Sequence, residues 1–168
     1  MSFEKKIAIV PGSFDPITLG HLDIIRRAAI SYDEVVVAVM INHNKQYLFT
    51  MEQREHLAKI ATASMARVCV ISSEGMLWKL AEDLGACAIV KGYRNPTDFA
   101  YEQEMAKYNY EHNPHAETVL LKANEELCDV SSTLVREALQ SGSNLTKYVP
   151  EAVSKEIHKI FSHSKNKS

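Results

Sequence analysis

The 168-residue chain carries little net charge and no long apolar run. A formal net charge of −2 leaves no basic excess of the kind found in nucleic-acid-binding proteins, so we expect no nucleic-acid partner. No apolar run approaches the ~20 residues that a bilayer span needs, so we expect no membrane contact either. The opening segment Met1–Lys6 lacks the pattern of a signal peptide. These features predict a cytoplasmic protein.

Cysteine is also sparse, and its spacing excludes a disulfide framework. The three cysteines, Cys69, Cys87 and Cys128, stand far apart and form no CxxC pair. Cys69 and Cys87 lie inside apolar runs, so we expect buried thiols in a reducing compartment. No cluster of side chains has the spacing of zinc ligands, and we predict no metal held by the protein itself.

What the chain does contain is an alternation of short apolar runs with segments of helical character. The predicted strands are Ile7–Val10, Val35–Ile41, Val68–Ile71, Ala86–Val90 and Thr118–Leu121. The predicted helices cover about 19–31, 51–64, 75–84, 97–112, 131–141 and 151–162. This order predicts an α/β fold of Rossmann-like, doubly wound type: a five-stranded parallel sheet with helices on both faces, followed by C-terminal helices. We expect one domain over 1–168, with a frayed tail at about 163–168.

The stretch from Val10 to His21 indicates a strand, a tight loop and a helix start. Its prolines, glycines, serine and aspartate are typical of turns, and Thr18 is a plausible N-cap with His21 in the first helical turn. A helix N-terminus offers unpaired N–H groups and about half a positive charge, which suits a polyphosphate. The Ser13 hydroxyl and the His21 ring would add donors. The alternative is an ordinary strand–helix connection with a surface histidine.

Three further segments place cations or hydroxyl groups near the ends of predicted strands or helices. Lys45 lies in the long connection 42–50, and Lys91 and Arg94 bracket a glycine after the fourth strand. In parallel sheets ligands bind beyond the carboxyl ends of the strands, so Lys91 and Arg94 are expected to face the same crevice as the loop 11–21. The run 131–133, Ser-Ser-Thr, opens a later helix and could form a second anion site. Each feature has an alternative explanation when taken singly. Lys45 could be a surface lysine, Asp98 could be a carboxylate in the first turn of a helix beside Arg94, and the hydroxyl groups of 131–133 could simply cap their helix.

These motifs together carry a family resemblance. Residues 11–21 resemble the signature of the nucleotidylyltransferase superfamily, which usually ends in His-x-Gly-His. The Thr-x-Gly-His ending found here is similar to that of the bacterial phosphopantetheine adenylyltransferases. Segments 91–102 and 130–136 resemble two further motifs of that family. The family usually has arginine where this chain has Lys91, and lysine keeps the charge but lacks the planar fork.

The resemblance implies an enzyme that transfers AMP from ATP to 4′-phosphopantetheine, giving dephospho-coenzyme A and pyrophosphate. The implied reaction is a direct in-line attack without a covalent enzyme intermediate. Mg²⁺ bridging the phosphate oxygens and a homohexameric assembly are also implied. A cytidylyltransferase, a nicotinamide-mononucleotide adenylyltransferase and a non-catalytic nucleotide sensor remain alternatives. Thr18 counts against the first two, which prefer His-x-Gly-His.

The same resemblance assigns roles to individual residues. His21 and Lys45 would stabilise charge on the α-phosphoryl oxygens, while Ser13 would position the attacking phosphate; these three are the implied catalytic residues. The implied ATP-binding residues are Ser13, Phe14, His21, Gly92, Tyr93, Arg94, Glu102, Leu127, Cys128, Asp129, Val130, Ser131, Ser132 and Thr133. The implied substrate-binding residues are Ser13, Lys45, Leu77, Lys91 and Asn109. Leu77 could equally be a core residue, and Leu127 predicts apolar packing rather than ring stacking beside the adenine.

Overall fold

A computed structural model of the chain describes residues 4–165. The last helix includes residues 163–165, the first half of the predicted frayed tail, while residues 166–168 of that tail lie outside the described residues. Within residues 4–165, no helix combines the length and the apolar composition needed to cross a membrane.

The centre of the molecule is a parallel sheet with strand order β3-β2-β1-β4-β5. Its strands are β1 (Ile7–Gly12), β2 (Glu34–Met40), β3 (Val68–Ser73), β4 (Ala88–Tyr93) and β5 (Glu117–Lys122). β1 lies in the middle and pairs with β2 on one side and β4 on the other. The direction of winding reverses between β1 and β4, so the predicted doubly wound parallel sheet is confirmed.

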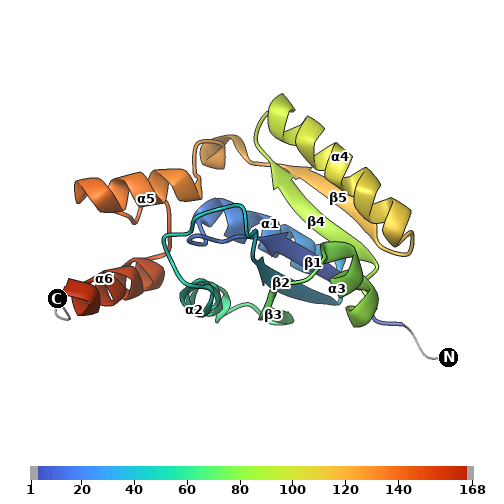
Figure 1. The fold of residues 1–168 in the computed structure, drawn as a ribbon, viewed down its shortest axis with the longest axis horizontal. Helices are drawn as coiled ribbons and strands as arrows, with labels where there is room; N and C mark the ends of the chain where they lie inside the picture. Colours follow the sequence, from blue (N-terminus) through green and yellow to red (C-terminus); the bar gives the residue numbers. More distant parts are fainter. Residues whose placement is uncertain (1–3, 166–168) are drawn as a thin grey trace.

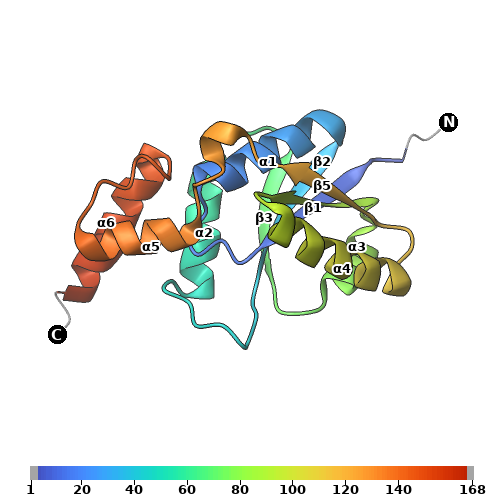
Figure 2. The same cartoon turned by 90° about the horizontal axis from the view of Figure 1, so that it is seen from above.

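Helices cover both faces of this sheet. The helices of residues 4–165 are α1 (Leu19–Ser31), α2 (Met51–Thr62), α3 (Leu77–Leu84), α4 (Pro96–His112), α5 (Ser132–Ser141) and α6 (Glu151–Lys165), with a short 3₁₀ turn, η1 (Glu125–Leu127). One buried cluster joins α1 and α2 to the sheet through Ile25, Leu57 and Val37. The other joins α3 to the opposite face through Ala81 and Ile9. α5 and α6 lie at the end of the molecule away from α3 (Figures 1 and 2).

One segment predicted as a loop, residues 91–93, belongs to the sheet. Lys91, Gly92 and Tyr93 were expected to follow the fourth strand, but they are its last three residues and pair with 120–122 of β5. A polar residue and a glycine gave no strand signal, and pairing with the neighbouring strand decided the outcome. The loop between β4 and α4 is therefore only Arg94 and Asn95.

The predicted burial of the cysteines is wrong. Cys69 is exposed, and Cys87 and Cys128 are half-buried. β3 is an edge strand of the sheet, and Cys69 faces the opposite side from its buried neighbour Val70. An apolar run at a sheet edge buries only part of its side chains, which the sequence alone did not distinguish.

Candidate active site

A cleft of about 760 Å³ opens beyond the carboxyl ends of β1 and β4, where the winding of the sheet reverses. This is the place where open α/β sheets bind ligands. The cleft brings together most of the predicted site residues from segments far apart in the sequence. They are Ser13, Phe14, His21, Lys45, Lys91, Gly92, Tyr93, Arg94, Glu102, Leu127, Val130, Ser131, Ser132 and Thr133.

The ring of His21 is held by the first turn of its own helix. The Thr18 N–H donates to Nδ1 of His21 at 3.0 Å, and the His21 N–H donates to Oγ1 of Thr18 at 3.3 Å. This reciprocal pair is a capping box at the start of α1. Because Nδ1 accepts a hydrogen bond, we assign the proton of the neutral ring to Nε2.

The surroundings of His21 keep it uncharged. Removal from water, and secondarily the positive charge of Arg94, lower the pKa of His21 to about 4. Phe14 packs against it edge to face, with ring centroids 4.9 Å apart. At pH 7 the side chain is therefore a neutral donor whose orientation is set before any ligand arrives.

The helix N-terminus that begins α1 has fewer free amides than the sequence suggested. The Leu19 N–H donates to the Tyr148 carbonyl, and that of His21 is used in the capping box. Of the first three amides of α1, the one at Gly20 has no acceptor among residues 4–165. A Cβ added at this position would lie 3.6 Å from the Val130 carbonyl oxygen, an ordinary contact distance, so the start of α1 lies beside the segment that leads into α5.

The start of α5 retains more of the expected anion-binding character. Ser131 is the N-cap, and its Oγ accepts the N–H of Leu134 at 3.2 Å. The amides of Ser132 and Thr133 have no acceptor within the described part of the chain. The Ser132 hydroxyl donates to the Pro16 carbonyl at 2.8 Å, which fastens this helix end to the loop before α1. Both predicted helix ends therefore border one cleft.

Two of the predicted cations are already paired inside the cleft. Nζ of Lys91 lies 2.6 Å from Oε2 of Glu102, and both side chains are largely buried. Nε of Arg94 lies 3.3 Å from Oδ2 of Asp98, one helical turn away. Lys45 is exposed on the loop 41–50 and has no ion pair with any described residue. A bound phosphate would meet Lys45 directly but would compete with carboxylates for the other two cations.

Four predicted binding residues do not line the cleft. Leu77 is half-buried and packs against the core beneath α3. Asn109 is buried in α4, and Asp129 is exposed. The Cys128 thiol contacts the carbonyl oxygens of residues 123 and 124. Leu127 of η1 does line the cleft and gives it an apolar surface at that point.

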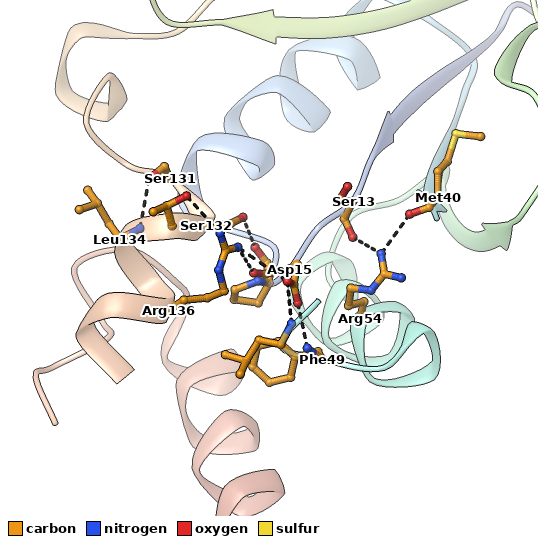
Figure 3. A network of polar contacts seen from close by, with 12 residues as sticks. Ser13, Asp15, Met40, Phe49, Arg54, Ser131, Ser132, Leu134 and Arg136 are labelled. Atoms are coloured by element: carbon orange, nitrogen blue, oxygen red, sulfur yellow. Dashed lines mark hydrogen bonds and ion pairs between the residues drawn. The ribbon is translucent and has the colours of Figure 1, made fainter. Parts of the chain in front are cut away.

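Sequence reasoning missed a network of charged side chains in and beside the cleft (Figure 3). Asp15 is 4% exposed, and its carboxylate accepts the N–H groups of Leu48 and Phe49, each at 3.0 Å. Nη1 of Arg136 donates to the Asp15 carbonyl at 2.8 Å and lies 3.7 Å from its carboxylate. Asp15 therefore ties the end of the loop 41–50 to the loop before α1. In the sequence it read as an ordinary turn residue.

Arg54 of α2 is the second missed residue, and it is 1% exposed. A signal for it exists in the sequence. Arg54 occupies the same helix face as Leu57 and Ala58, both fully buried, so it stands where an apolar residue is expected.

The fold and the cleft together define a nucleotidyltransferase-like protein. A family model described as Cytidylyltransferase-like matches residues 9–138, from within β1 to within α5. The match spans every segment that lines the cleft.

Relatives narrow the class further. The phosphopantetheine adenylyltransferase of Limosilactobacillus reuteri (strain DSM 20016) is 40% identical over 154 residues, covering 92% of this chain and 89% of the relative. That of Caldanaerobacter subterraneus subsp. tengcongensis is 40% identical over 159 residues, covering 95% and 99%. The chain belongs to the cytidylyltransferase-like family and, within it, to the phosphopantetheine adenylyltransferases.

Proposed function

We propose that this protein transfers AMP from ATP to 4′-phosphopantetheine, giving dephospho-coenzyme A and pyrophosphate. The observation that carries the proposal is the meeting of the α5 helix start, the neutral donor His21 and the cations Lys45, Lys91, Arg94 and Arg136 in one cleft at the sheet switch point. The names of the relatives indicate which acceptor such a cleft serves. The reaction would belong to the synthesis of coenzyme A.

In this proposal the acceptor phosphate attacks the α-phosphorus in line, and pyrophosphate leaves. An anionic phosphate is already a nucleophile, so the step needs no general base and no covalent enzyme intermediate. The remaining task is to position two anions and to stabilise the charge that develops between them. His21 Nε2–H and the Lys45 ammonium would donate to the α-phosphoryl oxygens. Ser13 would position the attacking phosphate, with Lys91 supplying positive charge.

The other end of ATP would lie against α5. The free amides of Ser132 and Thr133, with Arg94 opposite, would hold the β- and γ-phosphates. Leu127 would pack on the adenine. Neither Leu77 nor Asn109 lines the cleft. They would contact the pantetheine arm only if side chains of α3 and α4 moved to extend the cleft toward them. The binding roles of Cys128 and Asp129 would then have to rest on their backbone atoms.

Mg²⁺ would accompany ATP in the proposed reaction. Each of the three carboxylates in the cleft is committed, and residues 4–165 contain no group of three or more His, Cys, Asp or Glu side chains that could hold a metal ion. Mg²⁺ keeps most of its water and binds readily to substrate phosphates, so the cleft suits an ion held chiefly by ATP. Its chemistry when bound would be to neutralise charge shared between phosphate oxygens.

Release of pyrophosphate tests the proposal. The purified protein is assayed with ATP or CTP as donor, and with 4′-phosphopantetheine or nicotinamide mononucleotide as acceptor. We expect turnover only with ATP and 4′-phosphopantetheine. Preference for CTP or for the mononucleotide would support the corresponding alternative enzyme. Binding of ATP without turnover on any acceptor would indicate a nucleotide sensor.

Assembly and location remain part of the proposal. We also propose a homohexamer; Met105, Tyr108 and Tyr110 of α4, each at least 38% exposed, would offer an apolar surface for contact between copies. Sedimentation velocity at micromolar concentration would measure the assembly, and a monomer would contradict it. The cytoplasmic location is checked by fractionation of cells that express the protein.

A further inference from the structure

Arg54 connects the ends of the two strands that lead into the cleft. Its Nη1 donates to the carbonyl of Ser13, just after β1, at 2.7 Å and to that of Met40, the last residue of β2, at 3.0 Å. Figure 3 shows its guanidinium directed at both carbonyl oxygens. The guanidinium carbon also lies 4.0 Å from the centre of the Tyr47 ring. One side chain thus contacts both sides of the loop that carries Lys45.

Burial of the Arg54 guanidinium in the core is energetically unfavourable. No carboxylate among residues 4–165 lies within ion-pair distance of Arg54, and its Nε is buried without an acceptor. Burial lowers the pKa of Arg54, but a guanidinium stays protonated in proteins. Replacing buried charges by apolar side chains of similar size is often neutral or stabilising. Stability alone therefore does not account for this arginine.

The contacts of Arg54 coincide with the supports of the proposed catalytic groups. Lys45 lies between Met40 and Tyr47, which Arg54 contacts, and Asp15 holds the far end of the same loop at residues 48 and 49. Ser13 is held through its own carbonyl. We infer that Arg54 is a positioning residue, which fixes Lys45 and Ser13 relative to each other before the substrates bind. The inference rests on the proposed function, since it concerns the geometry of that reaction.

The physical benefit is preorganisation. A lysine side chain is flexible, and the loop that carries Lys45 is otherwise exposed. Catalysis by positioning is sensitive to displacements of about 1 Å, which can change rates by ~10²-fold. A fixed backbone on both sides of Lys45 limits how far its ammonium can move from the transferred phosphate. ATP itself would still be held by α5, which Arg54 does not contact.

The test is a double-mutant cycle between Arg54 and Lys45. Arg54→Met removes the charge and both hydrogen bonds at similar volume, and Arg54→Lys keeps the charge but lacks the fork. We expect Arg54→Met to lower kcat by ~10–100-fold with less than about a threefold change in the KM for ATP. Arg54→Lys should recover part of the loss. In a Lys45→Ala background, Arg54→Met should have little further effect on kcat, because no ammonium is left to position.

Hydrogen–deuterium exchange of residues 41–49 supplies a readout without substrates. We expect faster exchange in this segment for Arg54→Met, with the sheet unchanged. Arg26→Met, at an exposed arginine of α1, is the matched control and should change neither quantity. If Arg54→Met does not fold, Arg54→Lys and Tyr47→Leu replace it, the second removing the ring under the guanidinium.

The outcomes separate this inference from the proposed function. If the wild type releases no pyrophosphate, the proposed reaction is refuted. If exchange of residues 41–49 is unchanged in the Arg54 variants, the positioning role of Arg54 is refuted whether or not the wild type is active. A working wild type with additive effects of Arg54→Met and Lys45→Ala would show that Arg54 acts only on the fold. The positioning role is supported if Arg54→Met lowers kcat in the wild type but not in the Lys45→Ala background, and if residues 41–49 exchange faster in Arg54→Met.

Discussion

At the scale of single residues, His21 combines a fixed orientation with an uncharged ring. Its Nδ1 accepts the Thr18 N–H, so Nε2–H is the donor left for a ligand. One donor used only in the transition state is commonly worth ~10²–10³ in rate. We expect His21→Ala to lower kcat by at least ~10²-fold while ATP affinity, measured by calorimetry, changes little. Turnover close to that of the wild type would remove His21 from the catalytic set.

The lowered pKa of His21 also predicts a pH effect on stability. The unfolded chain binds this proton near the usual pKa of 6.5, whereas the folded protein binds it only near pH 4. The unfolded state therefore gains protons first, and stability falls as pH is lowered from about 6.5 to about 4. Thermal unfolding of the wild type and His21→Gln should show a difference that shrinks over this range. A constant difference would mean that the two states share one pKa.

Phosphopantetheine adenylyltransferases usually have arginine where this chain has Lys91. The pairing of Lys91 with Glu102 predicts that this difference affects binding of the acceptor phosphate. A single ammonium engaged at 2.6 Å must share its donors between the carboxylate and an incoming phosphate. An arginine could bind both through different edges of its fork. Lys91→Arg should therefore lower the KM for 4′-phosphopantetheine several-fold at nearly constant kcat, measured by initial rates. An unchanged or higher KM would show that this position does not bind the acceptor phosphate.

Residue identity near the cleft was predictable only where the signal is local. Thr18 and His21 lie within one helical turn, so their capping box follows from spacing. Arg54 and Asp15 bind backbone groups 41 and 34 residues away, at Ser13 and Phe49, and no local pattern encodes such partners. The resemblance implied which residues would contact ligands. It gave no information on the buried charges that hold them in place.

At the scale of elements, short apolar runs and helical spacing predicted each strand and each α-helix of residues 4–165, but not the 3₁₀ turn η1. The end of β4 was missed, since the pairing of Lys91–Tyr93 with β5 is a long-range property. Gly92 in this segment lies directly beneath α1. A side chain there would place Cβ 2.9 Å from Cγ1 of Ile24, closer than folded proteins permit.

Gly92→Ala should therefore push α1, and His21 with it, away from β4. Overpacking of this kind typically destabilises by ~1–3 kcal/mol, so we expect a lower thermal midpoint and a lower kcat together. Calorimetry and initial rates measure the two effects. Gly75→Ala is the matched control, because no atom lies within 4 Å of its added Cβ. Equal behaviour of the two variants would contradict the close approach of α1 to β4.

At the scale of the whole molecule, the winding of the sheet brings the ends of β1 and β4 together and leaves the cleft between them. Backbone amides, cations and hydroxyl groups from opposite halves of the chain then face one space. The carboxylates of this cleft are all engaged. Asp15 accepts two backbone N–H groups, Asp98 pairs with Arg94, and Glu102 pairs with Lys91.

That distribution of charge predicts how the protein depends on metal. A cleft with no free carboxylate has nothing to hold Mg²⁺ before ATP arrives, whereas ATP carries the ion on its own phosphate oxygens. Titration of Mg²⁺ into the ATP-free protein should therefore give no binding heat at millimolar concentration. EDTA should abolish pyrophosphate release, and added Mg²⁺ should restore it without refolding. Tight binding of Mg²⁺ by the protein alone would require one of these three carboxylates to leave its partner, and would overturn the view that positive charge in this cleft is organised for phosphate.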